Sequence, residues 1–291
     1  MSRCMVIAFA LFVVPTFLLI VPPSAAQTQA SCTFQLFNPP SGFSGDFFPM
    51  GVNHFKTVVG GAYTSNQNSE AGYTRFSGGG TSLFKAPHAL FTQLNRRNAS
   101  GVSVGQYSPA GQPGFPGPGS HGVMLTSNSQ ATLDYPGAGS TVLSGINKSN
   151  VIVGSALDTS TGGSFGFKHV NGKFSKIVFP HAVQTTTTAI NDNGVIAGSY
   201  ELGSFENPFS GYILQNGMFK SLSYIPADIN NAGTIVSGNT IHLPNGAVKT
   251  VNVPSSNQTH VNGINDLGTI TGAAHFGGTP GMWKGFTATC H

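Results

Sequence analysis

Charged side chains are scarce in this chain of 291 residues: Asp, Glu, Lys and Arg make up 8% of it, about a third of their share in an average soluble domain. No basic run or stripe occurs, so the usual electrostatic footprint of a nucleic-acid-binding protein is missing. Beyond the N-terminal segment there is no sustained 3.6-residue apolar periodicity, so we expect almost no helix.

Short catalytic and metal-binding signatures are also missing. The sequence has no Gly-x-Ser-x-Gly elbow, no His-Glu-x-x-His motif and no phosphate-binding loop. Its nine histidines are scattered without the spacing of zinc ligands. The turns around Asp192 and Asp266 lack the alternating acids of a calcium-binding loop. We therefore predict no metal site and no cofactor.

The N-terminus has the three-part pattern of a secretion signal. Arg3 precedes an apolar run from Met5 to Val21, and the small residues Ser24 and Ala26 follow. We predict that residues 1–26 are a cleaved signal peptide and that residues 27–291 form one secreted domain, extracellular or periplasmic, without a membrane span. A retained membrane anchor is the alternative, because the run is about long enough to cross a bilayer.

A motif of the form Asn-x-x-Gly-x-apolar-x-Gly recurs along the chain, complete in two copies and degraded in others. Its six copies begin at Asn53, Asn98, Asn147, Asn191, Asn230 and Asn265. A spacing of 35–49 residues between copies is typical of a propeller blade or a solenoid turn.

The first glycine of the motif is predicted to occupy a turn with positive φ; it is Gly194, Gly233 and Gly268 after Asn191, Asn230 and Asn265. Asn150 replaces it in the third copy, and asparagine is the other residue that best tolerates positive φ. The Asn-x-x-Gly segment is therefore interpreted as the turn between two strands of a hairpin. Lys56 stands at this position in the first copy, where either the turn differs or lysine is strained.

Two more strands are expected after each hairpin. The third strands are predicted at residues 72–76, 121–125, 165–169 and 211–215, and the fourth, ending in proline, at residues 82–89, 131–138, 174–182, 219–227 and 248–255. The last copy reaches a third strand at residues 284–290 but lacks a fourth, and an unclaimed strand of that type lies at residues 32–40. We predict an all-β, six-bladed β-propeller whose last blade is completed by residues 32–40; a β-solenoid or another blade count is the alternative.

The cysteines support this closure independently. Cys32 opens the N-terminal strand and Cys290 ends its predicted neighbour, so the two would lie within disulfide reach. A disulfide fits the oxidising compartment that the signal peptide predicts. Two unrelated free thiols are the alternative.

The segments GINDLGTITGAAHF (263–276), AINDNGVIAGSY (189–200) and GFKHVNGKFSKIVFPHA (166–182) resemble the bacterial extracellular HAF-repeat family. The resemblance covers nearly the whole chain after the signal and is strongest over residues 141–272. It implies a secreted, propeller-like repeat protein of bacterial origin. It brings no established catalytic residues that could be assigned to positions in this sequence.

Function is expected on the face opposite the Asn-x-x-Gly turns, because variable loops gather there: residues 61–71, 106–120, 155–164, 199–209 and 273–284. Aromatic side chains beside carboxylates suit a glycan or a peptide. The predicted ligand-binding residues are Tyr63, Tyr107, Phe115, Tyr200, Phe205, His275 and Trp283. We expect a monomeric binding or scaffold protein; the alternative interpretation is that the acids are solvated and the aromatics fill the blades.

An enzyme is the second hypothesis. An extracellular polysaccharide hydrolase or lyase would pair two carboxylates as acid and base. The acids available on this face for such a pair are Asp158, Glu201, Glu206 and Glu70. No motif supports a particular pairing.

Overall fold

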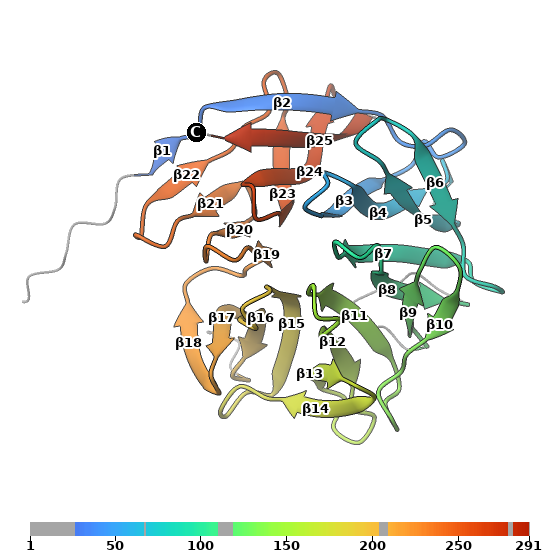
Figure 1. Ribbon diagram of the computed structural model, residues 1–291, viewed down its shortest axis with the longest axis vertical. Helices are drawn as coiled ribbons and strands as arrows, with labels where there is room; N and C mark the ends of the chain where they lie inside the picture. Colours follow the sequence, from blue (N-terminus) through green and yellow to red (C-terminus); the bar gives the residue numbers. More distant parts are fainter. Residues whose placement is uncertain (1–26, 67, 110–118, 204–208, 279–281, 291) are drawn as a thin grey trace, which may run out of the picture.

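The computed structural model describes residues 27–290 except 67, 110–118, 204–208 and 279–281. The predicted signal peptide, residues 1–26, lies outside the described residues. Six sheets stand around a common axis and form a closed ring (Figure 1). The described segments contain strands and turns but no helix, and hence no helix that could span a membrane.

We number the sheets as blades I to VI in the order of their motif copies. Blade I has β3 (Phe47–Val52), β4 (Val58–Tyr63), β5 (Glu70–Arg75) and β6 (Thr81–Phe84). Blade II has β7 (Phe91–Arg97), β8 (Ser103–Ser108), β9 (His121–Leu125) and β10 (Gln130–Thr132). Blade III has β11 (Thr141–Ile146), β12 (Ile152–Leu157), β13 (Ser164–Val170) and β14 (Lys173–Ile177).

Blade IV has β15 (Gln184–Ile190), β16 (Ile196–Glu201), β17 (Ser210–Gln215) and β18 (Met218–Leu222). Blade V has β19 (Asp228–Ile229), β20 (Ile235–Ser237), β21 (Thr240–His242) and β22 (Val248–Thr250), with β1 (Thr28–Gln29) added in parallel at its edge. Blade VI has β23 (Gln258–Ile264), β24 (Thr269–Phe276), β25 (Met282–Cys290) and β2 (Cys32–Phe37). The first strand of each repeat is innermost (Figure 1), and the innermost strands of neighbouring blades contact each other around the whole ring.

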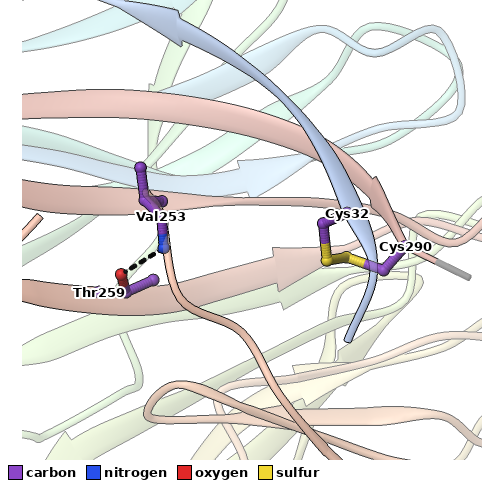
Figure 2. Close-up of a disulfide and its surroundings, with 4 residues drawn as sticks. All are labelled: Cys32, Val253, Thr259 and Cys290. Atoms are coloured by element: carbon purple, nitrogen blue, oxygen red, sulfur yellow. Dashed lines mark hydrogen bonds between the residues drawn. A yellow bond between two sulfur atoms is a disulfide. The ribbon is translucent and has the colours of Figure 1, made fainter. Parts of the chain in front are cut away.

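Blade VI confirms the predicted closure. The N-terminal strand β2 pairs antiparallel with β25, and Cys32 lies opposite Cys290. A disulfide joins the two cysteines (Figure 2), with their Cα atoms 4.1 Å apart. The strand ends at Phe37, three residues earlier than the segment predicted from the sequence.

The motif asparagines form a closed hydrogen-bonded ring near the axis. The Oδ1 atom of Asn191 accepts the backbone N–H of Val195 at 2.9 Å and so stabilises its own turn. Its Nδ2 group donates to the carbonyl oxygen of Asn230 in the next blade, 3.0 Å away. The same donation runs from each asparagine to the next and returns from Asn265 to Asn53. One residue type therefore shapes each turn and links the blades.

The two glycines of the motif have different roles. The first has the predicted positive φ, as in Gly194 at 78°, and Asn150 and Lys56 both take 58° in its place. Lys56 thus keeps the turn, although the left-handed backbone conformation is unfavourable for lysine. The second glycine makes room: a Cβ on Gly198 would overlap the carbonyl oxygen of Thr186 and lie 2.7 Å from the Tyr212 hydroxyl.

The fourth strands are shorter than predicted, since the chain leaves the rim before the proline. In blade III the strand stops at Ile177, and the Phe179 carbonyl accepts the N–H of Ala182 across a turn that contains Pro180. A threonine then holds the turn: Thr185 Oγ1 accepts the N–H of Phe179. The same contact between Val253 and Thr259 is seen in Figure 2. The apolar residues before the proline belong to these turns and not to the strand.

The hydrophobic core lies between neighbouring blades. Val236 and Ile241 of blade V, for example, pack with Ile270 and Phe286 of blade VI. The inner strands of each sheet are therefore buried on both sides, while outer strands such as β6 and β10 are exposed at the rim. The ends of the sheets carry the turns and loops, where binding residues are usually found.

Candidate functional site

The residues three positions before each motif asparagine line one cavity on the axis, toward the loop face. In five blades this residue is the extra residue of a β-bulge, where the innermost strand shifts register against the second strand. Bulges of this kind redirect a side chain. The six residues are Met50, Asn95, Ser144, Thr188, Ala227 and Asn262.

The next position is glycine or alanine in four blades because the innermost strands crowd there. A Cβ on Gly263 would lie only 3.0 Å from the Cα of Gly51. The two exceptions are Arg96 in blade II and Asp228 in blade V, whose strands β7 and β19 lie on opposite sides of the ring axis (Figure 1). The Nε atom of Arg96 is 3.3 Å from Oδ2 of Asp228.

This ion pair closes the axis. The Arg96 guanidinium also donates to the carbonyl oxygens of Met50, Ala227 and Asn262, at 2.6, 2.6 and 3.1 Å. Burial raises the pKa of Asp228, and the Arg96 charge counteracts that effect. Arg96 lines both the loop-face cavity and a smaller depression of about 100 Å³ on the face of the asparagine turns, so it separates the two.

The loop-face cavity has a volume of about 260 Å³ and combines apolar walls with amide groups. Val142, Ile225 and Pro226 supply apolar surface. The Nδ2 groups of Asn95 and Asn262 donate to backbone carbonyls, which leaves their Oδ1 atoms available as acceptors. Apart from Arg96, no described lining residue carries a charge, so the cavity is polar without being ionic.

Gln106 holds the one buried acceptor of this lining that lacks a partner among the described residues. Its Nε2 donates to Oε1 of Gln93 at 3.2 Å, while its own Oε1 makes no hydrogen bond. The residue is only 6% exposed. A buried carbonyl oxygen without a donor costs free energy that a ligand donor can recover.

Glu70 lies close behind the same wall. It is fully buried in β5 opposite Tyr63 of β4, and its carboxyl oxygens have no hydrogen bond of good geometry within the described structure. Its carboxyl and the Gln93 side chain both border Gly61. Burial raises the pKa of Glu70 to about 8, and the nearby Tyr63 hydroxyl works against the rise. Glu70 is therefore a neutral acid at neutral pH.

The predicted aromatic residues are spread over the blades. Tyr63 lies beside Phe91, Tyr107 stacks on His121, and Tyr200 is buried against Phe179. His275 and Trp283 come together in blade VI, with ring centres 5.1 Å apart. Phe115 and Phe205 lie outside the described residues. Apart from His275 and Trp283, those described lie in different blades.

The predicted acids also have separate partners. Asp158 accepts hydrogen bonds from Ser160, which lower its pKa, and lies 3.5 Å from Lys176. Glu201 accepts from Gln184 at 3.0 Å, and Glu70 lies next to Tyr63. Glu206 is not among the described residues. Asp158, Glu201 and Glu70 thus share no partner with one another. The described chain brings no three His, Cys, Asp or Glu residues together as a metal site would need.

The axial cavity was not predicted from the sequence, although one signal for it was available. When the six copies are aligned, Arg96 and Asp228 are the two charged residues at a position otherwise held by glycine or alanine. An isolated charge at a crowded small-residue position predicts a buried pair. Gln106 carries no comparable signal, because its burial depends on the neighbouring blade.

Comparison with known proteins supports the fold. No family model matches the sequence, and no curated protein is similar to it in sequence. The chain resembles the structure of a protein named as a candidate gluconolactonase, at 14% identity and a TM-score of 0.54, covering 92% of this chain and 94% of that one. It also resembles a gluconolactonase of Xanthomonas campestris, at 11% identity and a TM-score of 0.50, covering 93% and 99%. These likenesses show that the chain has the fold of a β-propeller.

Proposed function

We propose that this protein is a secreted binding protein that holds part of an uncharged, hydroxyl-bearing ligand in the axial cavity of its loop face. The observation that carries the proposal is the unpartnered, buried Oε1 atom of Gln106 in the cavity wall. We also infer that the chain is a monomer of the HAF-repeat type. The Cys32–Cys290 disulfide fits an oxidising compartment outside the cytoplasm.

The charges around the cavity favour a neutral ligand. Arg96 and Asp228 neutralise each other at its floor. A charged ligand would lose its hydration without gaining a counter-charge, which is costly. Apolar walls combined with acceptor oxygens suit a group that has both C–H faces and hydroxyl donors, as a sugar ring does. An extracellular glycan therefore fits better than a peptide.

No contact of the described residues favours the hydrolase or lyase alternative. Retaining or inverting glycosidases need two carboxylates at a defined separation, whereas Asp158, Glu201 and Glu70 have separate partners in different blades. The gluconolactonase likeness stands at low identity and supports a shared scaffold.

The test compares saccharide and peptide ligands in wild type and one matched pair of variants. An array of neutral saccharides and a panel of terminally capped peptides would select the probe, and calorimetry would measure its affinity. Gln106→Leu removes the free acceptor and should weaken saccharide binding about 5- to 150-fold, as for a lost buried hydrogen bond of ~1–3 kcal/mol. Gln215→Leu, at an exposed strand end, makes the same substitution away from the cavity and should leave the affinity unchanged.

Two results would overturn the proposal. Equal affinities of Gln106→Leu and Gln215→Leu would remove the cavity from the binding site. Binding of peptides but of no saccharide would reject the ligand class.

A further inference from the structure

A polar cavity of about 190 Å³ lies in the cleft between blade VI and blade I. The side of blade VI that faces this cleft carries Phe37 and Trp283, which pack with Phe47 of blade I. Residues at every second position of β2 and β25, and those opposite them in β24, share that side. The lining residues that point to it are Thr33, Gln35, Thr269, Thr287 and Thr289. Lys56, in the turn between β3 and β4 of blade I, borders the cavity from across the cleft.

The threonines stand where apolar side chains close another cleft of the ring. Val195 of blade IV and Thr269 of blade VI each lie four residues after the motif asparagine. Ile213 and Thr287 are likewise equivalent in the registers of their blades. Val195 and Ile213 pack with β19 and β20 of the next blade, whereas blade VI presents hydroxyl groups at both positions. The hydroxyls that line the cavity have no hydrogen-bond partner among the described residues.

The charged groups around the cavity are cations. The Lys56 ammonium has no acid partner within the described part of the chain. The Arg75 guanidinium of blade I lies over the ring of Phe37, with its Cζ 4.7 Å from the ring centre, on the same side of blade VI. The acid nearest along the chain to the lining, Asp266, accepts hydrogen bonds from Asn231 and so is directed toward blade V. No described carboxylate lines the cavity, so its surroundings favour an anion.

Lys56 keeps its charge at this place in an unfavourable backbone conformation. Its φ is 58°, and the equivalent residue in the other copies of the motif is glycine or, at position 150, asparagine. Either of those residues would form the turn with less strain. Non-glycine residues held in such a conformation concentrate at functional sites. The strained lysine is therefore an observation separate from the unpartnered threonines, and both lie at the same cavity.

We propose that this cavity binds an oxyanion, with the Lys56 ammonium as its charged partner and the threonine hydroxyls as hydrogen-bond donors. Lysine binds phosphate groups as a point charge, and each threonine hydroxyl supplies one O–H donor. The anion is either a free sulfate or phosphate ion or the same group carried by an extracellular saccharide. No residue of this site lines the axial cavity, so the inference goes beyond the proposed function and is independent of it.

The test is a titration followed by amide resonances in NMR spectra of the mature protein. The probes are sodium sulfate, sodium phosphate and a sulfated hexasaccharide, at an ionic strength kept constant with sodium chloride. At least one probe should cause saturable shifts at Thr33, Thr269 and Thr289. Lys56→Asn should weaken that binding about 10- to 150-fold, as for a lost hydrogen bond to a charged group of ~1.5–3 kcal/mol. Lys148→Asn is the matched control, because it removes the same charge from the corresponding turn of blade III, and asparagine already holds both positions in other copies of the motif.

The proposal is rejected if no probe causes saturable shifts at the lining threonines, or if Lys56→Asn binds as tightly as Lys148→Asn. Tighter binding of the sulfated hexasaccharide than of free sulfate would identify a group carried by a saccharide, and equal affinities would identify a free ion. Lys56→Gly restores the usual residue of the turn and should reproduce the loss of binding. Both Lys56 variants should melt no lower than wild type, which separates lost binding from lost folding. Gln106→Leu should leave this titration unchanged, so failure of the axial cavity and failure of the anion site are distinguishable.

Discussion

Glu70 is the side chain whose environment differs most from its usual one. The folded protein keeps its proton up to a pKa of about 8, whereas the unfolded chain releases it near 4.5. The folded state therefore binds the proton more tightly. The stability linked to this proton is fully present below pH 4.5, falls as the pH rises from 4.5 to 8, and stays lost above that.

The variant Glu70→Gln tests this behaviour, because glutamine keeps the shape and cannot ionise. Its free energy of unfolding should match that of wild type near pH 4 and exceed it near pH 9, by as much as a few kcal/mol. Urea unfolding at both pH values measures the difference. Glu201→Gln serves as the control, since Glu201 is partly exposed and already accepts a hydrogen bond from Gln184. An unchanged pH slope in Glu70→Gln would contradict the expectation.

The hairpin of each repeat is a turn and a blade-to-blade link at the same time. Asn191 shows both functions, because its Oδ1 accepts N–H groups of its own turn and its Nδ2 donates to Asn230 in the neighbouring blade. Replacing the amide of Asn191 by a carboxylate separates the two functions. The oxygen that accepts within the turn remains, and the Nδ2 group that donates to the next blade is lost. A carboxylate oxygen would then face the Asn230 carbonyl.

We expect Asn191→Asp to lower the free energy of unfolding by about 1–3 kcal/mol, the cost of leaving a buried acceptor unpaired. Asn191→Ala should cost more, since the turn also loses its side-chain acceptor. The neighbouring Asn193→Asp is the control: its amide donates to Asn231 at an exposed site, so it should cost little. Denaturant unfolding gives all three values, and equal costs for Asn191→Asp and Asn193→Asp would count against the ring of asparagines as a stabilising link.

The whole ring is braced by Arg96, whose guanidinium contacts blades I, V and VI from its place in blade II. Removing one partner of a buried ion pair leaves an uncompensated charge. Arg96→Met should therefore destabilise the protein by about 3–5 kcal/mol. The double variant Arg96→Met/Asp228→Asn should recover part of that loss, because no buried charge remains.

A double-mutant cycle from denaturant unfolding measures this coupling. The surface pair Lys148–Asp192, with Nζ and Oδ2 4.0 Å apart, provides the comparison, and Lys148→Met should cost less than about 1 kcal/mol. If Arg96→Met is no more costly than Lys148→Met, or if the double variant shows no recovery, the pair does not brace the ring.

Features that repeat or lie close along the chain could be predicted from the sequence. The spacing of Asn191, Asn230 and Asn265 indicated the blades, Asn150 in place of glycine indicated the φ of the turn, and the missing last strand indicated closure by residues 32–40. Each of these predicted features depends on hydrogen bonds within a turn or between neighbouring strands, and local sequence patterns encode such bonds directly. The extents of the fourth strands were wrong, because apolar residues serve the following proline turn as well as a strand.

The candidate binding surface depends on contacts between blades, which no local sequence pattern encodes. Arg96 and Asp228 meet because six twisted sheets bring opposite innermost strands to one axis, and Gln106 and Glu70 are buried because a neighbouring blade covers them. The short turn at Gly238 matters only through the depression that it leaves between blade V and residues 256–260. The sequence by itself determined the repeating unit and its number, since both follow from backbone pairing; the tertiary structure decided where polar side chains are buried, since burial arises between blades.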